Sequence, residues 1–447
     1  MLRHWRYDVE EEWVGARTPL EYALAEGFEL LRWSVLAAST IGPGTVIVCS
    51  KAGYNYGLRL LWPLVLASGV AYALQEGAAR LSIADRTTLG GAMRTLWRDP
   101  KRPTATPKRC SAVALGVLVG NAAYQANNFV GAAEALYALG APRNNVAVRV
   151  FMHFGLAAAI LLTLFFGDTD RVSAALGVVS VGMVAVFAAA VAELGVDAEK
   201  LFLGLLPTPP PSGSAVVAVS LVATTAVPFN AFLASCSAKP PAGPGAAAAR
   251  RAVSSMRRGV TLSTWIAAVL SVLIVATGAG VDHDGTSDGD YGVPTLVSGL
   301  RKAEGSFAVF CFGLGLYAAA FSSTLTVALG AALCCGSLLA DDAEDPAWKP
   351  PRGARARGVI VGVTGFAAVV GAAGAPTVPV VLCAQVVNGI LLPVVALCLV
   401  LCVEAPRAAA LPPLGRSLAL VFAFGATVFL ATNSLVGFAA SDSASLA

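Results

Sequence analysis

Two short stretches of sequence decide the fold: residues 39–45, Ser-Thr-Ile-Gly-Pro-Gly-Thr, and residues 224–230, Thr-Thr-Ala-Val-Pro-Phe-Asn. Each lies within a long apolar run, where proline removes a backbone donor and glycine lowers helix stability. In hydrocarbon, the backbone groups that such a break frees must find partners in the protein or line a cavity. One break alone would indicate a simple proline kink. A matched pair, one in each half of the chain, predicts a midplane substrate site in a transporter built from inverted repeats.

The composition indicates a membrane protein. Of the 447 residues, 56% are apolar and 13% are charged, and the mean hydropathy is +0.71. Because soluble domains have about a quarter of their residues charged, a large soluble enzyme with a membrane tail is excluded. One crossing needs about 20 apolar residues, and the sequence predicts an all-α polytopic protein with eleven such segments. They span residues 33–52, 58–79, 111–139, 148–167, 172–195, 215–236, 260–280, 306–338, 358–374, 379–402 and 417–438.

The loops predict the orientation. Most of the 31 lysines and arginines fall in alternate loops, beginning with the one before the first segment. Cytoplasmic loops carry the excess of positive charge, so we expect a cytoplasmic N-terminus and an extracytoplasmic C-terminus. The predicted parts are a cytoplasmic segment at 1–32, one transporter domain at 33–438 and an outer tail at 439–447. The sequence leaves open which membrane holds the protein, and the nine cysteines are expected to be packing residues.

Polar side chains gather in a few of the apolar segments. Gln125 and Asn128 are three residues apart and share a helix face, as do Gln385 and Asn388. Such amides serve either as hydrogen bonds between helices or as ligands, and the spacing leaves both roles open. The ionisable residues within the segments are few: Glu76, which we expect nearer the cytoplasmic side, Glu134 and Glu193, expected toward the outer surface, and His153, expected to be packed.

Several motifs together resemble one family. They are residues 39–44, 74–81, 228–233, 320–323, and the Ala-Gln, Asn-Gly and Leu-Pro pairs within 384–393. Over nearly its full length the chain resembles the Nramp divalent metal transporters. The resemblance implies a LeuT-type fold, in which helices 1–5 and 6–10 are inverted repeats and an eleventh helix is added. It also implies a divalent cation as substrate.

The chain departs from the family pattern at the residues that handle metal and protons. Typical members read Asp-Pro-Gly-Asn where this chain has Gly-Pro-Gly-Thr at 42–45, and Met-Pro-His where it has Val-Pro-Phe at 227–229. The acidic pair linked to proton movement aligns with Gln125 and Asn128. In these departures the chain resembles the proton-uncoupled, magnesium-transporting branch related to the Nramps.

These losses predict how the ion is handled. Without a thioether, the preference for softer transition metals loses its basis, and Mg²⁺ keeps several waters when it binds. We expect transport of a partly hydrated Mg²⁺, with Mn²⁺ tolerated, by alternating access and without proton coupling. The expected pathway comprises Gly42, Thr45, Thr224, Val227, Asn230, Gln385, Gln125 and Asn128, beside the helix breaks at Pro43, Gly44 and Pro228. The expected metal-facing oxygens, partly acting through water, belong to Thr45, Thr224, Asn230 and Gln385.

Three other functions stay open at this stage. The first is proton-coupled Mn²⁺ or Fe²⁺ transport, with other residues supplying the lost ligands. The second is transport of a small organic solute, whose carboxylate would sit at the half-helix ends. The third is a sensor that transports nothing. No nucleophile–base constellation or phosphate loop occurs in the sequence, so an enzyme is not expected. Neither are a cofactor, a nucleic acid or an obligate protein partner.

Overall fold

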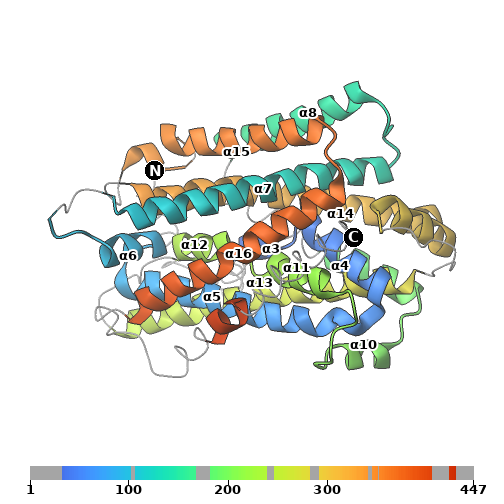
Figure 1. The fold of residues 1–447 in the computed structure, drawn as a ribbon, viewed down its shortest axis with the longest axis horizontal. Coiled ribbons are helices and arrows are strands. Elements are labelled where there is room, and N and C mark those ends of the chain that lie inside the picture. The colour runs from blue at the N-terminus through green and yellow to red at the C-terminus, as the bar shows by residue number, and fades with distance from the viewer. Residues whose placement is uncertain are drawn as a thin grey trace, which may run out of the picture.

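The computed structural model describes residues 33–101, 106–167, 182–238, 246–281, 291–340, 345–350, 352–404 and 422–428. Every regular element in these ranges is a helix, and the long helices run side by side in one bundle (Figure 1). The predicted all-α architecture is therefore confirmed. The N-terminal segment 1–32, the tail 439–447, the first half of the fifth predicted segment and most of the eleventh lie outside the described residues.

The first half of the chain contains a broken helix followed by longer ones. Its elements are α3 (Ser34–Thr40), α4 (Pro43–Tyr56), η1 (Gly57–Leu60), α5 (Leu61–Asp85), α6 (Leu89–Leu96), α7 (Lys108–Ala138), α8 (Val146–Phe166), an apolar helix at Gly182–Glu193, and α10 (Ala198–Gly204).

The second half begins with another broken helix. Its elements are α11 (Ala215–Thr225), α12 (Pro228–Ser237), α13 (Ala246–Gly280), α14 (Val293–Leu339), η2 (Pro346–Trp348), α15 (Ala354–Ala372) and α16 (Thr377–Glu404). Within α14, Gly305 has φ of 78°, a left-handed conformation at which the helix bends.

Seven helical stretches among the described residues are long and apolar enough to cross a membrane. One of them, Pro43–Asp85, combines α4, η1 and α5. The 31-residue α7 is also long enough, but it is not among the seven, and its buried face carries several amides. The count of eleven crossings and the orientation stay predictions.

Both predicted breaks are true interruptions. Ile41 and Gly42 separate α3 from α4, and Ala226 and Val227 separate α11 from α12. All four have non-helical dihedral angles, and those of Gly42 and Val227 are extended. Pro43 and Pro228 occupy the first position of the following half-helix, where a missing N–H costs nothing. Each proline therefore starts a helix, and neither break is a kink.

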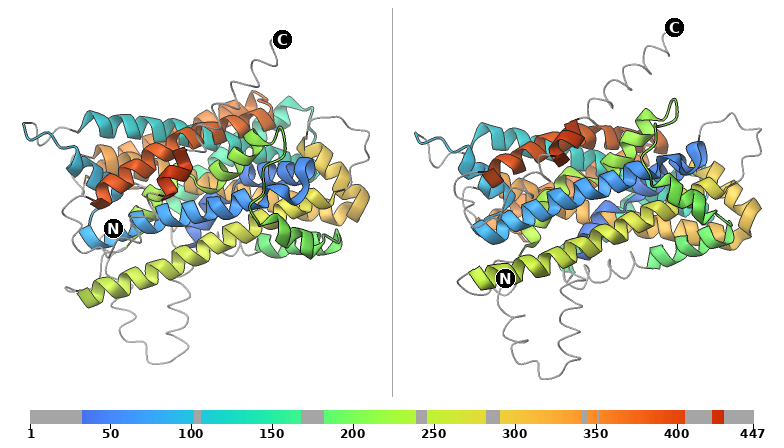
Figure 2. Two further views of the ribbon diagram at one scale, coloured as in Figure 1. Left: turned by 60° about the horizontal axis from the view of Figure 1, so that its bottom comes forward. Right: turned by 90° about the horizontal axis from the view of Figure 1, so that it is seen from below.

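Close helix contacts hold the half-helices in place. A methyl group on Gly53 of α4 would overlap the backbone of Val275 in α13, and one on Gly131 of α7 would overlap Pro43. Figure 2 shows α13 running along α4 and α5 on one side of the bundle. Helices α8 and α15 pack together at another edge (Figure 1).

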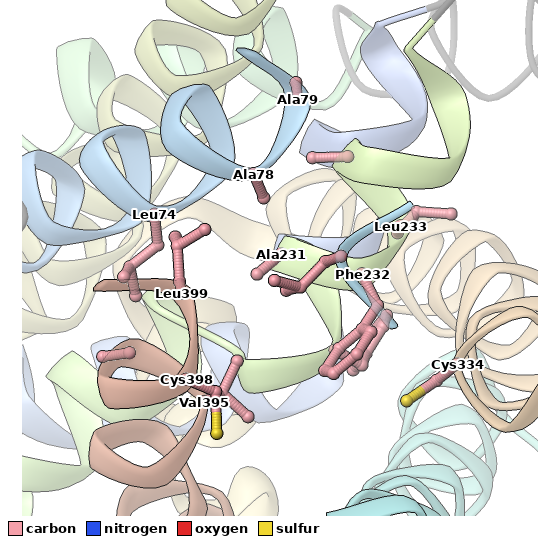
Figure 3. Packing of buried hydrophobic residues seen from close by; sticks show 14 of the residues in the cluster. Leu74, Ala78, Ala79, Ala231, Phe232, Leu233, Cys334, Val395, Cys398 and Leu399 are labelled. Carbon is pink, nitrogen blue, oxygen red and sulfur yellow. The ribbon is translucent and has the colours of Figure 1, made fainter. Parts of the chain in front are cut away.

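A large cluster of buried apolar side chains is formed mainly by α5, α12, α14 and α16. Figure 3 shows Leu74 of α5 and Leu399 of α16 close to one another, and Phe232 next to Ala231 and Leu233 on α12. The cysteines contribute to this packing: Cys334, Cys398 and other members are buried, and all nine cysteines are free thiols.

Candidate ion pathway at the broken helices

Three helices and the four half-helices converge on the two breaks. Helices α7, α14 and α16 each contact α4, and the half-helices contact one another through α3 with α12 and α4 with α11. Polar side chains from both halves of the chain are therefore brought to one buried place, as the matched breaks predict.

Two threonines join the breaks. The hydroxyl of Thr45 donates to the carbonyl of Thr40 at 2.7 Å and lies 2.9 Å from the hydroxyl of Thr224. Since the single Thr45 proton goes to Thr40, Thr224 donates to Thr45. The Thr45 oxygen is therefore engaged within the protein, while the Thr224 carbonyl lacks the donor that a continuous helix would provide, because residue 228 is proline.

Asn230 ties the second break to the first. Its Nδ2 donates to the Thr40 hydroxyl at 3.1 Å, and that hydroxyl donates in turn to the carbonyl of Leu36. The Oδ1 of Asn230 is buried and has no hydrogen-bond partner among the described residues. We call a buried amide atom of this kind, without a partner in the described part of the chain, unpaired.

The two amides of α7 that replace the acidic pair are bound to α14. Gln125 Nε2 donates to the carbonyl of Thr324 at 3.1 Å, and Asn128 Nδ2 donates to the hydroxyl of Ser323 at 3.0 Å. Their oxygens, Oε1 and Oδ1, are unpaired. Each amide thus uses its nitrogen for packing and keeps its oxygen available.

Gly42 stands where the resemblance to the Nramp transporters implies a metal-binding carboxylate. A methyl group there would lie 2.8 Å from Ser323 Oγ and 3.0 Å from Asn128 Oδ1. A larger side chain at this position would have to displace the Ser323 hydroxyl and the Asn128 amide. The neighbouring side chains are therefore fitted to a glycine.

Gln385 and Asn127 meet at Gly44, the first turn of α4. A methyl group on Gly44 would lie 2.6 Å from the side-chain nitrogens of both residues. Gln385 and Asn127 are fully buried, and both polar atoms of each side chain are unpaired. Asn127 was not among the residues expected in the pathway, although its place in the run Gln-Ala-Asn-Asn at 125–128 is a signal that could have found it.

Apolar side chains occupy the positions of the family's methionine and histidine. Val227 is buried in the apolar cluster. Phe229 packs edge-on against Tyr124, with ring centroids 6.2 Å apart, and lies over Gly330. Neither position offers a ligand for a soft metal.

Two adjoining cavities of about 470 and 390 Å³ lie at one end of the bundle and share Glu134, Tyr137 and Arg143 in their walls. Arg143 binds both oxygens of Glu134, at 2.9 and 2.6 Å, and Thr377 of α16 donates to the same carboxylate at 2.9 Å. The hydrogen bonds to Glu134 stabilise the charged guanidinium and raise the pKa of Arg143.

The other ionisable residues within the segments also lie away from the breaks. His153 is buried and stacks on Phe129 near the cavities, and Glu193 is exposed. At the opposite end, Glu76 pairs with Arg80 at 3.2 Å and with Arg257 at 2.9 Å. Among the described residues, no group of three or more His, Cys, Asp or Glu side chains could hold a metal ion. A cation at the breaks would meet neutral oxygens.

Two interrupted helices around a buried polar site, in a bundle of apolar helices, define a multi-pass membrane protein of the LeuT type. The fold resembles that of the manganese transporter of Eremococcus coleocola, with a TM-score of 0.69 at 17% identity over 94% of this chain and 88% of that one. It also resembles MhsT bound to L-phenylalanine, with a TM-score of 0.60 at 16% identity over 92% and 97% of the two chains. The expected LeuT-type fold is confirmed.

The chain belongs to the Nramp family: the family model described as natural resistance-associated macrophage protein-like matches residues 34–436. A curated relative, the divalent metal cation transporter MntH of Erwinia tasmaniensis, is 28% identical over 300 residues, which cover 65% of this chain and 68% of the relative. The protein is therefore an integral, multi-pass membrane protein.

Proposed function

We propose that this protein transports divalent cations, with Mg²⁺ as the main substrate and Mn²⁺ tolerated, as partly hydrated ions and without proton coupling. The observation that carries the proposal is the set of unpaired amide oxygens at the helix breaks, from Gln125, Asn128, Asn230 and Gln385. Membership of the family and the printed functions of its relatives support a divalent cation as substrate. Transport, and not catalysis, is the activity that this membership supports.

The amide oxygens suit an ion that keeps its water. Neutral oxygens alone do not compensate a divalent ion for a stripped hydration shell, and Mg²⁺ gives up water reluctantly. Water bound to the ion donates hydrogen bonds, and unpaired amide oxygens accept them. The Thr45 hydroxyl donates to the Thr40 carbonyl, and in this proposal it keeps that bond. It contacts the ion through a water molecule.

The apolar replacements support a preference for harder ions. Thioether and imidazole ligands favour transition metals over Mg²⁺ and Ca²⁺. Val227 and Phe229 offer neither and pack against apolar neighbours.

The same amides support uncoupled transport. A proton relay needs groups that titrate, and Gln125 and Asn128 do not. The nearest carboxylates along α7 and α5, Glu134 and Glu76, are held in ion pairs at opposite ends of the bundle. Along α5 and α7, no carboxylate or imidazole side chain therefore lies between these ion pairs and the breaks.

Flux in proteoliposomes tests the proposal. Trapped dyes for Mg²⁺ and Mn²⁺ would be read beside an internal pH dye, with protein-free vesicles as the control. We expect Mg²⁺ entry driven by the membrane potential, slower Mn²⁺ entry, and no acidification. Entry of Mn²⁺ alone, with acidification, would overturn the proposal in favour of proton-coupled transition-metal transport.

A further inference from the structure

A second group of unpaired amides lies between α7 and α16. Asn121 is four residues before Gln125 on α7 and shares its face, and Asn388 is three residues after Gln385 on α16. Both asparagines are at least 97% buried, and the Nδ2 of each is unpaired. The Oδ1 of Asn388 is directed at the backbone of Gly120, where a methyl group would lie 3.0 Å away. Asn388 therefore lies at the interface of these helices, against the residue that precedes Asn121.

This group lies on one defined side of the breaks. Thr377, at the start of α16, bonds to Glu134 near the end of α7, so the two helices run antiparallel. Moving from Gln125 to Asn121 and from Gln385 to Asn388 leads away from the cavities at Glu134 and toward the end that holds α6. The step from Gln125 to Asn121 is about 6 Å along the axis.

Leu391 closes the far end of the group. Its methyl groups would lie 2.9 Å from a methyl group on Gly116 and 2.8 Å from one on Gly120, so its side chain lies directly on the backbone of α7. Beyond it, Val117, Leu392 and Val395 belong to the apolar cluster. Buried polar side chains therefore follow one another from the breaks to Asn121 and Asn388, and Leu391 is the next apolar contact between α16 and α7.

We propose that Asn121 and Asn388 form a second station for the hydrated cation, with Leu391 as the apolar barrier between this station and the end of the bundle that holds α6. The inference rests on the proposed function. An amide offers both a donor and an acceptor, and its N–H groups repel a bare cation. A hydrated ion can pair with both atoms of the amide. Water bound to the ion donates to the amide oxygen, and water of the outer shell accepts from the amide nitrogen.

Substitutions with opposite expected effects test the station. We expect Asn121→Leu and Asn388→Leu each to lower Mg²⁺ influx into proteoliposomes at least tenfold, while Mg²⁺ still raises the melting temperature through the site at the breaks. Leu391→Ala shortens the barrier and should raise Mg²⁺ influx at least twofold, which no misfolded protein would do. Thr364→Val is the control, because Thr364 lies on α15 and its buried hydroxyl is also without a partner among the described residues.

The melting temperature of the two asparagine variants distinguishes a role in ion passage from a role in holding the helices together. If the two asparagines served as hydrogen bonds between helices, leucine would lower the melting temperature, whereas loss of an unpaired amide should leave it unchanged or higher. Influx within twofold of the unsubstituted protein in both asparagine variants would overturn the station alone. Absence of Mg²⁺ influx in the unsubstituted protein would overturn the proposed function and the station with it.

Discussion

At the scale of single residues, the space at Gly42 is set by the side chains that surround it. Ser323 and Asn128 approach the backbone of Gly42 so closely that any side chain there would have to push them aside. The loss of the family's metal ligand is therefore matched by neighbours on α7 and α14. Val227 is different, because it stands in extended backbone that accepts any side chain, and its surroundings are apolar.

Val227→Met should therefore restore a soft ligand without strain in the backbone. We expect about tenfold tighter Cd²⁺ binding, a gain of about 1.4 kcal/mol, because a thioether is a soft ligand that favours such metals. Isothermal titration of the purified protein would measure it, with Val227→Leu as the control of similar bulk and no sulfur. Equal Cd²⁺ affinity in the two variants would mean that residue 227 does not face the ion.

At the scale of elements, the position of α4 depends on the contact of a proline ring with the backbone of a glycine. Pro43 begins α4 and lies against Gly131 of α7, where a methyl group has no space. Because α4 carries Gly44 and Thr45 into the site, a shift of this half-helix would move the groups that meet at the breaks.

Gly131→Ala should lower the stability of the protein by about 1–3 kcal/mol, the usual effect of overpacking, and should also reduce Mg²⁺ influx. Thermal unfolding in detergent and flux in proteoliposomes would measure the two effects. Gly155→Ala on α8 is the matched control, because no atom lies within 4 Å of the added methyl group. In a helix interior alanine is favoured over glycine, so this control should not destabilise. A Gly131→Ala variant as stable as the control would contradict the contact.

At the scale of the whole molecule, ion pairs join distant segments at the two ends of the bundle. Glu134, Arg143 and Thr377 connect α7, the following loop and α16 at one end. Glu76 connects α5 to α13 through Arg257 at the other. Both sets are formed in this structure, so each end of the bundle is held by a charged pair.

Arg257→Ala should destabilise the fold by about 1–3 kcal/mol, because it removes a charged hydrogen bond from the buried Glu76. The control is Arg355→Ala, since Arg355 is 57% exposed in its pair with Asp345, and exposed pairs contribute about 0–1 kcal/mol. Thermal unfolding of both variants is the measurement. Equal melting temperatures would mean that Arg257 does not hold α5 and α13 together.

Much of the architecture could be predicted from local chemistry. Apolar runs of crossing length predict membrane helices, and Pro43 and Pro228 mark the breaks because neither has an N–H to continue a helix. Those features depend only on neighbours along the chain. The pathway residues Gln125, Asn128, Asn230 and Gln385 were named from the sequence, and the structure places them around the breaks; their role in ion movement stays a prediction.

Only the tertiary structure decided which polar atoms are engaged and which are unpaired. Thr45 was expected to face the ion, yet its oxygen bonds to Thr40 and to Thr224, 179 positions away in sequence. Gln125 binds a carbonyl 199 positions away, which leaves its oxygen unpaired. Asn127 and Gln385 meet at Gly44 because α7 and α16 both pack on α4. Composition and spacing determine the helices and their breaks, whereas the state of each buried polar atom depends on partners that only the packing of distant helices brings within reach.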